Sequence, residues 1–334
     1  MPQVSLITPM YNEESCIKEN IQQVIEVLKN FGTSWEYLLV DDGSVDNSYK
    51  IALDAIKEYP QCKIVHYLVN RGRGYALRQG FAAARGKYII STESDLSWGS
   101  DIIRTIYDEL VFSGCDVVVA SVFHEKGGFK KVPLFRRLLS KVGNWVMRCC
   151  FESSITQFSG MTRGYKRQAI QSMHLEENDK EIHLEIISRV EALGLRISEI
   201  PATIKWGKER TEGGIRKKIS ILRYILPHLL SSLNQGSLKI LLGLALLLSS
   251  VGIGFAIFGT IDKIFSEGGT ATPFIVNYGL ILLLIALVFV LFAGVSVQLR
   301  YIKKSLVHLQ SQVVALNRNK KGRTKETSVR GEEQ

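Results

Sequence analysis

Apolar and polar positions follow two different rhythms along the first 200 residues. Short runs rich in β-branched and aromatic residues alternate with longer segments in which apolar residues recur every three or four positions. This pattern predicts strands over residues 4–8, 37–40, 64–67, 88–91 and 116–120, and helices over residues 15–30, 48–59, 75–84 and 101–113. Such alternation is typical of an α/β domain whose mostly parallel sheet is covered by helices on both faces.

The pattern continues less regularly beyond residue 130. We expect an amphipathic helix over residues 133–151, a helix around residues 181–193, and late strands over residues 195–201 and 203–206. Residues 219–233 place apolar side chains on one helical face. That face suits a helix lying in a membrane interface, and it equally suits a core helix packed on the domain.

Two long apolar runs dominate the last third of the chain. Residues 240–261 and 274–299 contain no charged side chain, and each run exceeds the about 20 residues that cross a bilayer core. A signal peptide fits poorly, because residues 1–9 lack a basic region followed by a long apolar one. We therefore expect a hairpin of two transmembrane helices within residues 237–299, with spans of about 238–261 and 274–299.

The charge distribution bears on the partners of the chain. The formal net charge is +10, and many of the cations lie in residues 205–223 and 300–330, which flank the apolar runs. The connector between the runs, residues 262–273, has one Lys against one Asp and one Glu. This asymmetry predicts an integral membrane protein with the first domain and both termini in the cytoplasm. A lipid bilayer explains the positive charge better than nucleic acid does, so we expect no nucleic acid partner.

Three weaker signals give simple expectations. The five cysteines show no CxxC pair, which favours reduced thiols over zinc or structural disulfides. Residues 317–334 are polar and charged and are expected to be disordered. Leu306, Leu309, Val313 and Leu316 recur at helical spacing, so they could join copies of the chain in a homo-oligomer or rest on the protein itself or on lipid.

Polar residues collect directly after the expected strands. They occur at Pro9 to Glu13, Asp41 to Ser44, Asn70 to Gly74 and Glu93 to Asp95. Because ligands bind at the carboxyl ends of parallel strands, these segments predict one cleft. Two carboxylates at one strand end can hold a divalent cation that neutralises a diphosphate, and glycines 72 and 74 would let the backbone approach a ligand closely. An acidic pair alone is more typical of a solvated turn, whereas the ordered set is more specific.

In this order, the motifs resemble the family 2 glycosyltransferases with a GT-A fold. The resemblance rests on PMYNE at 9–13, VDDGSVD at 40–46, NRGRGYA at 70–76 and ESD at 93–95. QFSGMTRGY at 157–165, and EIP at 199–201 followed by Arg210 and Gly213, look like later segments of the family. With two C-terminal spans, the chain most closely resembles the polyprenyl-phosphate (dolichyl-phosphate type) glycosyltransferases, over roughly residues 4–300.

The resemblance implies an inverting transfer of a sugar from a nucleotide-sugar to a polyprenyl phosphate, with Mg²⁺ or Mn²⁺ as cofactor. It implies donor binding by Pro9, Tyr11, Glu13, Asp41 and Asp42. It implies that Glu93 and Asp95 hold the metal, with Ser94 beside them at the diphosphate. Asp95 is the strongest catalytic candidate. Arg136 and Ser140 match a pair that holds the acceptor phosphate, Arg163 matches a donor-side or active-site arginine, and Arg210 and Arg216 match cations near the diphosphate.

The expected organisation follows from these assignments. Residues 1–216 form the GT-A catalytic domain, residues 217–236 form juxtamembrane amphipathic helices, residues 237–299 form the hairpin, and residues 300–334 form a basic cytoplasmic tail.

Several positions depart from the family pattern. Glu93 stands where an Asp is usual, Val122 where an Arg is usual, and Ile215-Arg216 where Ser-Lys is usual. Gln157 replaces an Asp and cannot act as a base. A lipid monophosphate needs no base, because its second pKa is about 6 and it is already anionic at pH 7. Two alternatives stay open: a transferase with a hydroxyl acceptor, and a catalytically weak nucleotide-sugar-binding membrane scaffold.

Overall fold

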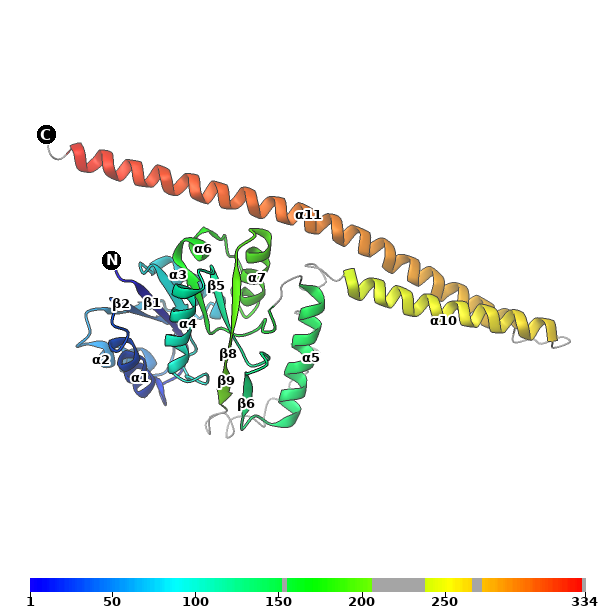
Figure 1. The fold of residues 1–334 in the computed structure, drawn as a ribbon, viewed down its shortest axis with the longest axis horizontal. Helices are drawn as coiled ribbons and strands as arrows, with labels where there is room; N and C mark the ends of the chain where they lie inside the picture. Colours follow the sequence, from blue (N-terminus) through cyan, green and yellow to red (C-terminus); the bar gives the residue numbers. More distant parts are fainter. Residues whose placement is uncertain (152–154, 206–237, 266–271, 332–334) are drawn as a thin grey trace. The chain divides into compact units, whose positions relative to one another are not determined.

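The computed structural model describes residues 1–151, 155–205, 238–265 and 272–331 (Figure 1). Its main element is a seven-stranded sheet with the order β3-β2-β1-β4-β7-β5-β8. The strands are β1 Val4–Met10, β2 Trp35–Asp41, β3 Cys62–His66, β4 Tyr88–Ser91, β5 Val117–Ser121, β7 Arg163–Lys166 and β8 Ile197–Pro201. Only β7 is antiparallel to its neighbours β4 and β5 among these described strands. The expected mostly parallel sheet is therefore confirmed.

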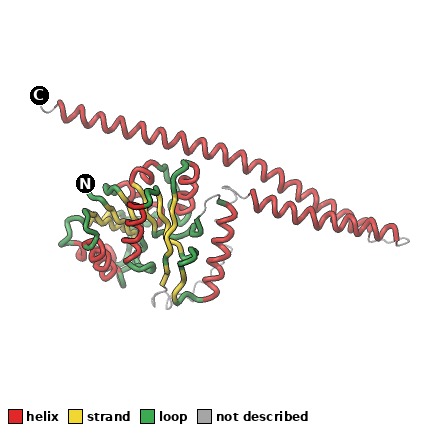
Figure 2. Tube along the Cα trace, in the orientation of Figure 1, coloured by secondary structure: helices red, strands yellow, loops and turns green. Residues whose placement is uncertain are grey.

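Helices cover both faces of the sheet (Figure 2). Along β1, Leu6 joins one core with the apolar sides of α1 and α4, whereas its neighbour Ile7 joins the other core with α3 and α7. This alternation follows from the period of two in a strand, and burial on both sides explains why the strands are almost entirely apolar. The helices are α1 Ile17–Lys29, α2 Ser48–Ile56, α3 Arg73–Ala83, α4 Asp101–Phe112, α6 Arg167–Ser172 and α7 Ile182–Ala192.

Two short strands lacked a clear pattern in the sequence, and a third was predicted. The strand β7 has four residues and begins and ends with a cation, so it shows no apolar run. The strands β6 Gly128–Lys130 and β9 Thr203–Lys205 pair in a separate two-stranded sheet. The expected strand at residues 203–206 thus exists, but it does not extend the main sheet.

Two long helices follow the α/β domain, namely α10 Leu238–Phe265 and α11 Thr272–Gly331. Their segments Leu241–Asp262 and Phe274–Leu299 have mean hydropathies of 2.4 and 3.1, and only 17% of the most apolar window in each is buried. By length and composition, both helices can cross a membrane. They approach closely at two glycines, since a Cβ at Gly279 would lie 2.7 Å from the Gly252 carbonyl oxygen. Small residues at such crossings are typical of helices packed in lipid.

Two expectations for the C-terminal third have a different outcome. The expectation of disorder over residues 317–334 is wrong for the described part, because α11 continues without a break to Gly331. These residues contain no proline and are rich in Lys, Arg and Glu, which propagate a helix well. The helix expected at residues 219–233, and with it the juxtamembrane segment 217–236, lies outside the described residues.

A buried carboxylate ties three segments of the sheet together. Glu36 on β2 is 2% exposed, and its carboxylate accepts hydrogen bonds from Ser5 Oγ at 2.5 Å and from the Arg85 backbone N–H at 2.6 Å. The Arg85 guanidinium adds bonds of 3.1 and 3.0 Å. Burial alone would raise the pKa of Glu36, but the hydrogen bonds from Ser5 and Arg85 outweigh it and hold this pKa below its ordinary value.

Glu36→Gln should lower the free energy of unfolding at pH 7 by about 2 kcal/mol, because it removes charge-assisted hydrogen bonds from a buried site. Since the pKa of Glu36 is lower in the folded than in the unfolded chain, its contribution is present above about pH 4.3 and disappears as the pH falls through the folded-state pKa. Denaturant titrations should show a smaller difference in the free energy of unfolding between Glu36→Gln and the wild type at pH 3.5 than at pH 7. The exposed Glu58→Gln serves as control, and a loss as large there would contradict the prediction.

Candidate active site

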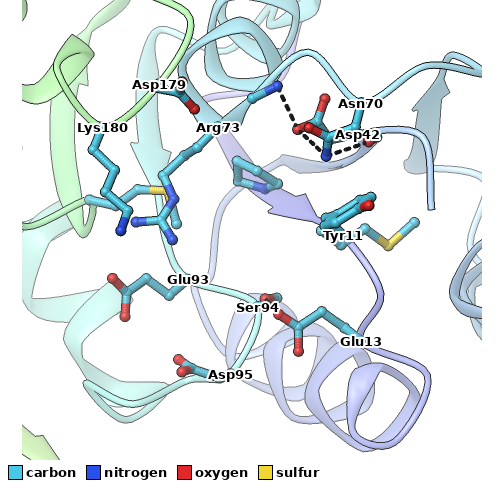
Figure 3. Close-up of a pocket in the computed structure, with 14 residues that line it drawn as sticks. Tyr11, Glu13, Asp42, Asn70, Arg73, Glu93, Ser94, Asp95, Asp179 and Lys180 are labelled. Carbon is cyan, nitrogen blue, oxygen red and sulfur yellow. Dashed lines mark hydrogen bonds between the residues drawn. The ribbon is translucent and has the colours of Figure 1, made fainter. Parts of the chain in front are cut away.

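A cleft of about 330 Å³ opens at the carboxyl ends of β1, β2 and β4 (Figure 3). This is where the strand order reverses, because β1 lies between β2 on one side and β4 on the other. Ligands of open α/β sheets bind at such switch points. The cleft is lined by Pro9, Met10, Tyr11, Glu13, Asp42, Asn70, Gly72, Arg73, Glu93, Ser94, Asp95, Met161, Asp179 and Lys180.

Side chains join the loops that follow β1 and β4. The Ser94 hydroxyl donates to Glu13 Oε1 at 3.0 Å, and the Asn20 side-chain amide donates to the Ser94 carbonyl at 2.7 Å. The Glu13 backbone N–H also donates to Ser48 Oγ at 2.7 Å. The same cleft is lined by six of the site residues predicted at the ends of β1 and β4, namely Pro9, Tyr11, Glu13, Glu93, Ser94 and Asp95.

One serine holds both carboxylates of the acidic loop after β4. The Ser97 hydroxyl donates to Glu93 Oε2 at 2.7 Å, and the Ser97 backbone N–H donates to Asp95 Oδ1 at 3.0 Å. The intervening Leu96 has φ of +46°, a left-handed conformation that turns the chain tightly enough for both contacts. In Figure 3 the two carboxylates lie on the same side of their loop.

This acidic pair fits a divalent cation whose remaining ligands come from a substrate. Among the described residues, no three His, Cys, Asp or Glu side chains gather in a way that could hold a metal ion. Mg²⁺, however, is commonly bound by one or two carboxylates together with substrate phosphates and water. Glu93 and Asp95 therefore suit Mg²⁺ or Mn²⁺ bound together with a diphosphate.

Ser97→Ala should weaken the binding of Mn²⁺ in the presence of a diphosphate by about tenfold, because partners that orient metal ligands typically contribute that much to metal affinity. The variant keeps the backbone bond to Asp95 and loses only the hydroxyl bond to Glu93. A Mn²⁺ titration followed by electron paramagnetic resonance measures the change in affinity. The matched control is Ser100→Ala, since Ser100 precedes α4 without a side-chain capping bond. Equal curves for wild type and Ser97→Ala would contradict this reading of the loop.

Asp42 organises one wall of the cleft. Its carboxylate accepts hydrogen bonds from Tyr67 Oη at 2.7 Å, Asn70 Nδ2 at 3.1 Å, and the backbone N–H groups of Arg71 and Gly72 at 2.9 and 3.0 Å. Burial and the bond to this carboxylate raise the pKa of Tyr67, so the phenol stays a donor. Asp42 thus fixes the loop after β3 as well as lining the cleft.

Asp41, its neighbour, does not line the cleft. It is fully buried, accepts hydrogen bonds from the Ser44 backbone and hydroxyl, and contacts His66 Nδ1 at 2.7 Å. Asp41 is the last residue of β2, whereas Asp42 follows the strand. The contact between Asp41 and the donor stays a prediction. Asp41 holds the turn that carries Asp42.

The role of two glycines is broader than expected. A Cβ at Gly74 would lie 2.5 Å from the Glu177 carbonyl oxygen, and a Cβ at Gly72 would lie 2.5 Å from the Asn178 carbonyl oxygen. Both glycines thus allow close approach of the chain's own 177–179 segment, and Gly72 also lines the cleft. The Asn178 carbonyl accepts hydrogen bonds from the N–H groups of Gly74 at 2.6 Å and Tyr75 at 3.0 Å.

The cationic candidates lie away from the cleft or outside the described chain. Arg163 is 0% exposed and does not line the cleft, and its guanidinium donates to the carbonyls of His183 at 2.9 Å and Phe158 at 2.6 Å. Its donor-side role stays a prediction. Arg136 and Ser140 are exposed on α5 Leu134–Cys150 and do not line the cleft. Arg210 and Arg216 lie outside the described residues.

Four polar residues of the cleft had no assigned role. Asn70 and Arg73 belong to the NRGRGYA motif, but sequence alone did not show which of its side chains turn inward. Asp179 and Lys180 come from a segment before α7 that carries no motif. Only an indirect indication of these two residues was present in the sequence. Gly72 and Gly74 indicated a close contact, but not that the 177–179 segment makes it.

Comparison with known proteins identifies the fold and the family. Residues 5–173, about half of the chain, match the model of glycosyl transferase family 2. The chain belongs to this family. Glucosyl-3-phosphoglycerate synthase from Mycobacterium tuberculosis, solved with UDP, superposes with a TM-score of 0.52 at 17% identity, covering 69% of this chain and 80% of that structure. The same synthase with Mn²⁺, UDP-glucose and phosphoglyceric acid gives 0.51 at 17% identity, over 69% of this chain and 79% of that one. The GT-A fold is thereby confirmed.

Relatives of this family 2 chain include transferases named for undecaprenyl phosphate. The undecaprenyl-phosphate 4-deoxy-4-formamido-L-arabinose transferase of Pectobacterium carotovorum is 31% identical over 172 residues, covering 51% of this chain and 50% of the relative. The Shewanella sediminis transferase of the same name is 27% identical over 264 residues, covering 78% and 74%. The chain thus spans about half the length of the Pectobacterium relatives.

Proposed function

We propose that this family 2 chain is a membrane-anchored glycosyltransferase that moves a sugar from a nucleotide-sugar to a polyprenyl phosphate. The observation that carries the proposal is the cleft with Glu93 and Asp95, in a chain that also contains two helices able to cross a membrane. The relatives named as undecaprenyl-phosphate sugar transferases support the acceptor class. Residues 1–216 would carry the reaction, and residues 237–299 would anchor it with both termini in the cytoplasm.

The donor would occupy the part of the cleft between the β1 and β4 loops. Tyr11 is half-exposed there and offers a ring and a hydroxyl, while Glu13 and Ser94 form a bonded pair at the floor. Glu93 and Asp95 would hold Mg²⁺ or Mn²⁺ against the donor's two phosphates. The ion, when bound, would supply positive charge that stabilises the departing nucleoside diphosphate. The mycobacterial synthase solved with Mn²⁺ and UDP-glucose has the same fold, which supports a divalent ion in this cleft.

The acceptor would supply its own nucleophile. Gln157, which stands where the family usually has an acid, is 5% exposed and carries no ionisable group. A phosphate monoester is already anionic at pH 7, so its oxygen can attack the anomeric carbon without a base. The bond from that carbon to the diphosphate breaks, and the nucleoside diphosphate leaves with the electron pair. A single displacement of this kind inverts the anomeric centre.

The amphipathic helix α5 supports reaction at a membrane surface. Leu134, Phe135, Leu138 and Trp145 on this helix are 61 to 79% exposed. Arg136 and Ser140, four residues apart, share a different face of the same helix. Apolar side chains on one face with cations beside them are typical of helices that lie in a bilayer interface. In this position the pair would meet a lipid phosphate that approaches along the membrane.

A transfer assay tests the proposal. The purified full chain in detergent is incubated with UDP- and GDP-linked sugars, Mg²⁺ or Mn²⁺, and either undecaprenyl phosphate or a lipid with a free hydroxyl, and the products are identified by mass spectrometry. A glycosylated lipid phosphate that disappears with EDTA is the expected result. Product formed only with the hydroxyl lipid would refute the acceptor class. Nucleotide binding without product from any combination would favour a membrane scaffold over an enzyme.

A further inference from the structure

Two cations from different segments reach the same wall of the cleft. Arg73 is the first residue of α3, and Lys180 lies in the loop before α7. In Figure 3 the guanidinium of Arg73 and the ammonium of Lys180 both point toward the side of the cleft that carries Glu93. They are 107 positions apart in the chain, so only the tertiary fold brings them to one place.

The wall that carries them is fixed by hydrogen bonds. Asn178 caps the first turn of α3 through its carbonyl, and Arg78 donates to the Leu175 carbonyl at 3.0 Å. The buried Glu185 carboxylate accepts the backbone N–H groups of residues 176 and 177 at 3.0 to 3.1 Å. The segment before Lys180 is thus anchored to both α3 and α7, which limits the entropy lost when its side chains bind a ligand.

Most backbone N–H groups at the start of α3 already have hydrogen-bond partners. Free N–H groups at a helix N-terminus commonly bind phosphates. At α3, the N–H groups of Gly74 and Tyr75 already donate to the Asn178 carbonyl, and that of Ala76 donates to the Gly72 carbonyl. These three N–H groups are therefore not available to an anion at this wall. Arg73 and Lys180 supply cationic side chains that can hold one.

The charge balance of the cleft gives these cations a specific use. Among the described lining residues, five are carboxylates, at positions 13, 42, 93, 95 and 179, and two are cations. A divalent ion at Glu93 and Asp95 would compensate the negative charge of a diphosphate bound beside them. A second phosphate entering this acidic cleft would need its own positive partners.

We propose that Arg73 and Lys180 form a phosphate-binding subsite on the wall of the cleft that faces Glu93. This inference rests on the proposed function and adds to it the residues that hold one of the reacting phosphates. Arg73 can bind two phosphate oxygens with its planar guanidinium, and Lys180 adds a point charge on a longer, mobile stem. The phosphate belongs either to the lipid acceptor or to the donor diphosphate.

Binding titrations of the full chain in detergent distinguish the two sources. One arm uses farnesyl phosphate, with farnesol as the uncharged control, and the other uses pyrophosphate with Mg²⁺. Arg73→Ala and Lys180→Ala should each weaken at least one charged probe by about tenfold, the usual effect of losing a charge-assisted hydrogen bond, and leave farnesol binding unchanged. A loss confined to farnesyl phosphate assigns the subsite to the acceptor, and a loss confined to pyrophosphate assigns it to the donor.

A matched variant controls for net charge. Arg71 lies two residues from Arg73 but stacks on the Tyr75 ring, 4.9 Å from its centroid, and does not line the cleft. Arg71→Ala should therefore bind both probes like the wild type. Unchanged affinities in both Arg73→Ala and Lys180→Ala, or an equal loss in Arg71→Ala, would overturn the subsite. Because no sugar is transferred in these titrations, a chain that binds the probes but forms no product would refute the proposed function and leave the subsite standing.

Discussion

Asp95→Asn should reduce sugar transfer by about a thousandfold while leaving the fold intact. The amide keeps the size of the carboxylate and can still accept the Ser97 N–H bond of 3.0 Å, so the loop geometry is preserved. What disappears is the negative charge that, in the proposed site, binds the metal ion and through it the leaving diphosphate. Loss of stabilisation at a departing group commonly costs two to three orders of magnitude in rate.

The measurement combines rate, metal affinity and stability. Initial rates with saturating donor and acceptor should fall, Mn²⁺ binding followed by electron paramagnetic resonance should weaken, and the thermal unfolding temperature should stay within about 2 °C of the wild type. Asp108→Asn is the matched control, because Asp108 pairs with Arg104 on the exposed side of α4, 2.9 Å away and outside the cleft lining. Full activity of Asp95→Asn would refute the assigned role.

The cleft could be predicted from the sequence because its main elements are local. Apolar runs fix the strands, and the residues that directly follow them, such as Tyr11, Glu13 and Asp95, must emerge at the carboxyl edge of the sheet. It is harder to predict from the sequence which of two neighbouring side chains faces the cleft. Asp41 ends β2 and is fully buried, whereas Asp42 follows the strand and lines the cleft.

Residues placed by long-range packing could not be predicted in this way. Arg163 lies on β7, which inserts antiparallel between β4 and β5, and that register buries its guanidinium against two carbonyls. Lys180 reaches the cleft only because a distant segment rests on the glycines of α3. No local sequence pattern predicts the position of Arg163 or Lys180. The resemblance to the family implied a role for Arg163 and none for Lys180.

Gly74→Ala tests whether that packing matters, because helix propensity and close contact predict opposite signs at this position. Gly74 lies in the first turn of α3 without a positive φ, so alanine would by propensity alone stabilise the helix by up to about 1 kcal/mol. Its Cβ, however, would lie 2.5 to 2.7 Å from three backbone atoms of residues 177–179. Real Cβ atoms do not approach backbone so closely, and the segment must move.

We expect Gly74→Ala to destabilise the fold by about 2 kcal/mol, as overpacking commonly does, and to lower kcat/KM for transfer by about a hundredfold, because a displacement of about 1 Å in a positioning segment can cost that much. Gly143→Ala is the control, since Gly143 lies within α5 and its added Cβ meets nothing within 4 Å. That variant should be as stable as the wild type or slightly more so, with unchanged activity. Thermal unfolding and steady-state rates are measured on both variants. If Gly74→Ala were as stable and as active as Gly143→Ala, the 177–179 segment would move away from α3 at no cost and would not hold Lys180 in place.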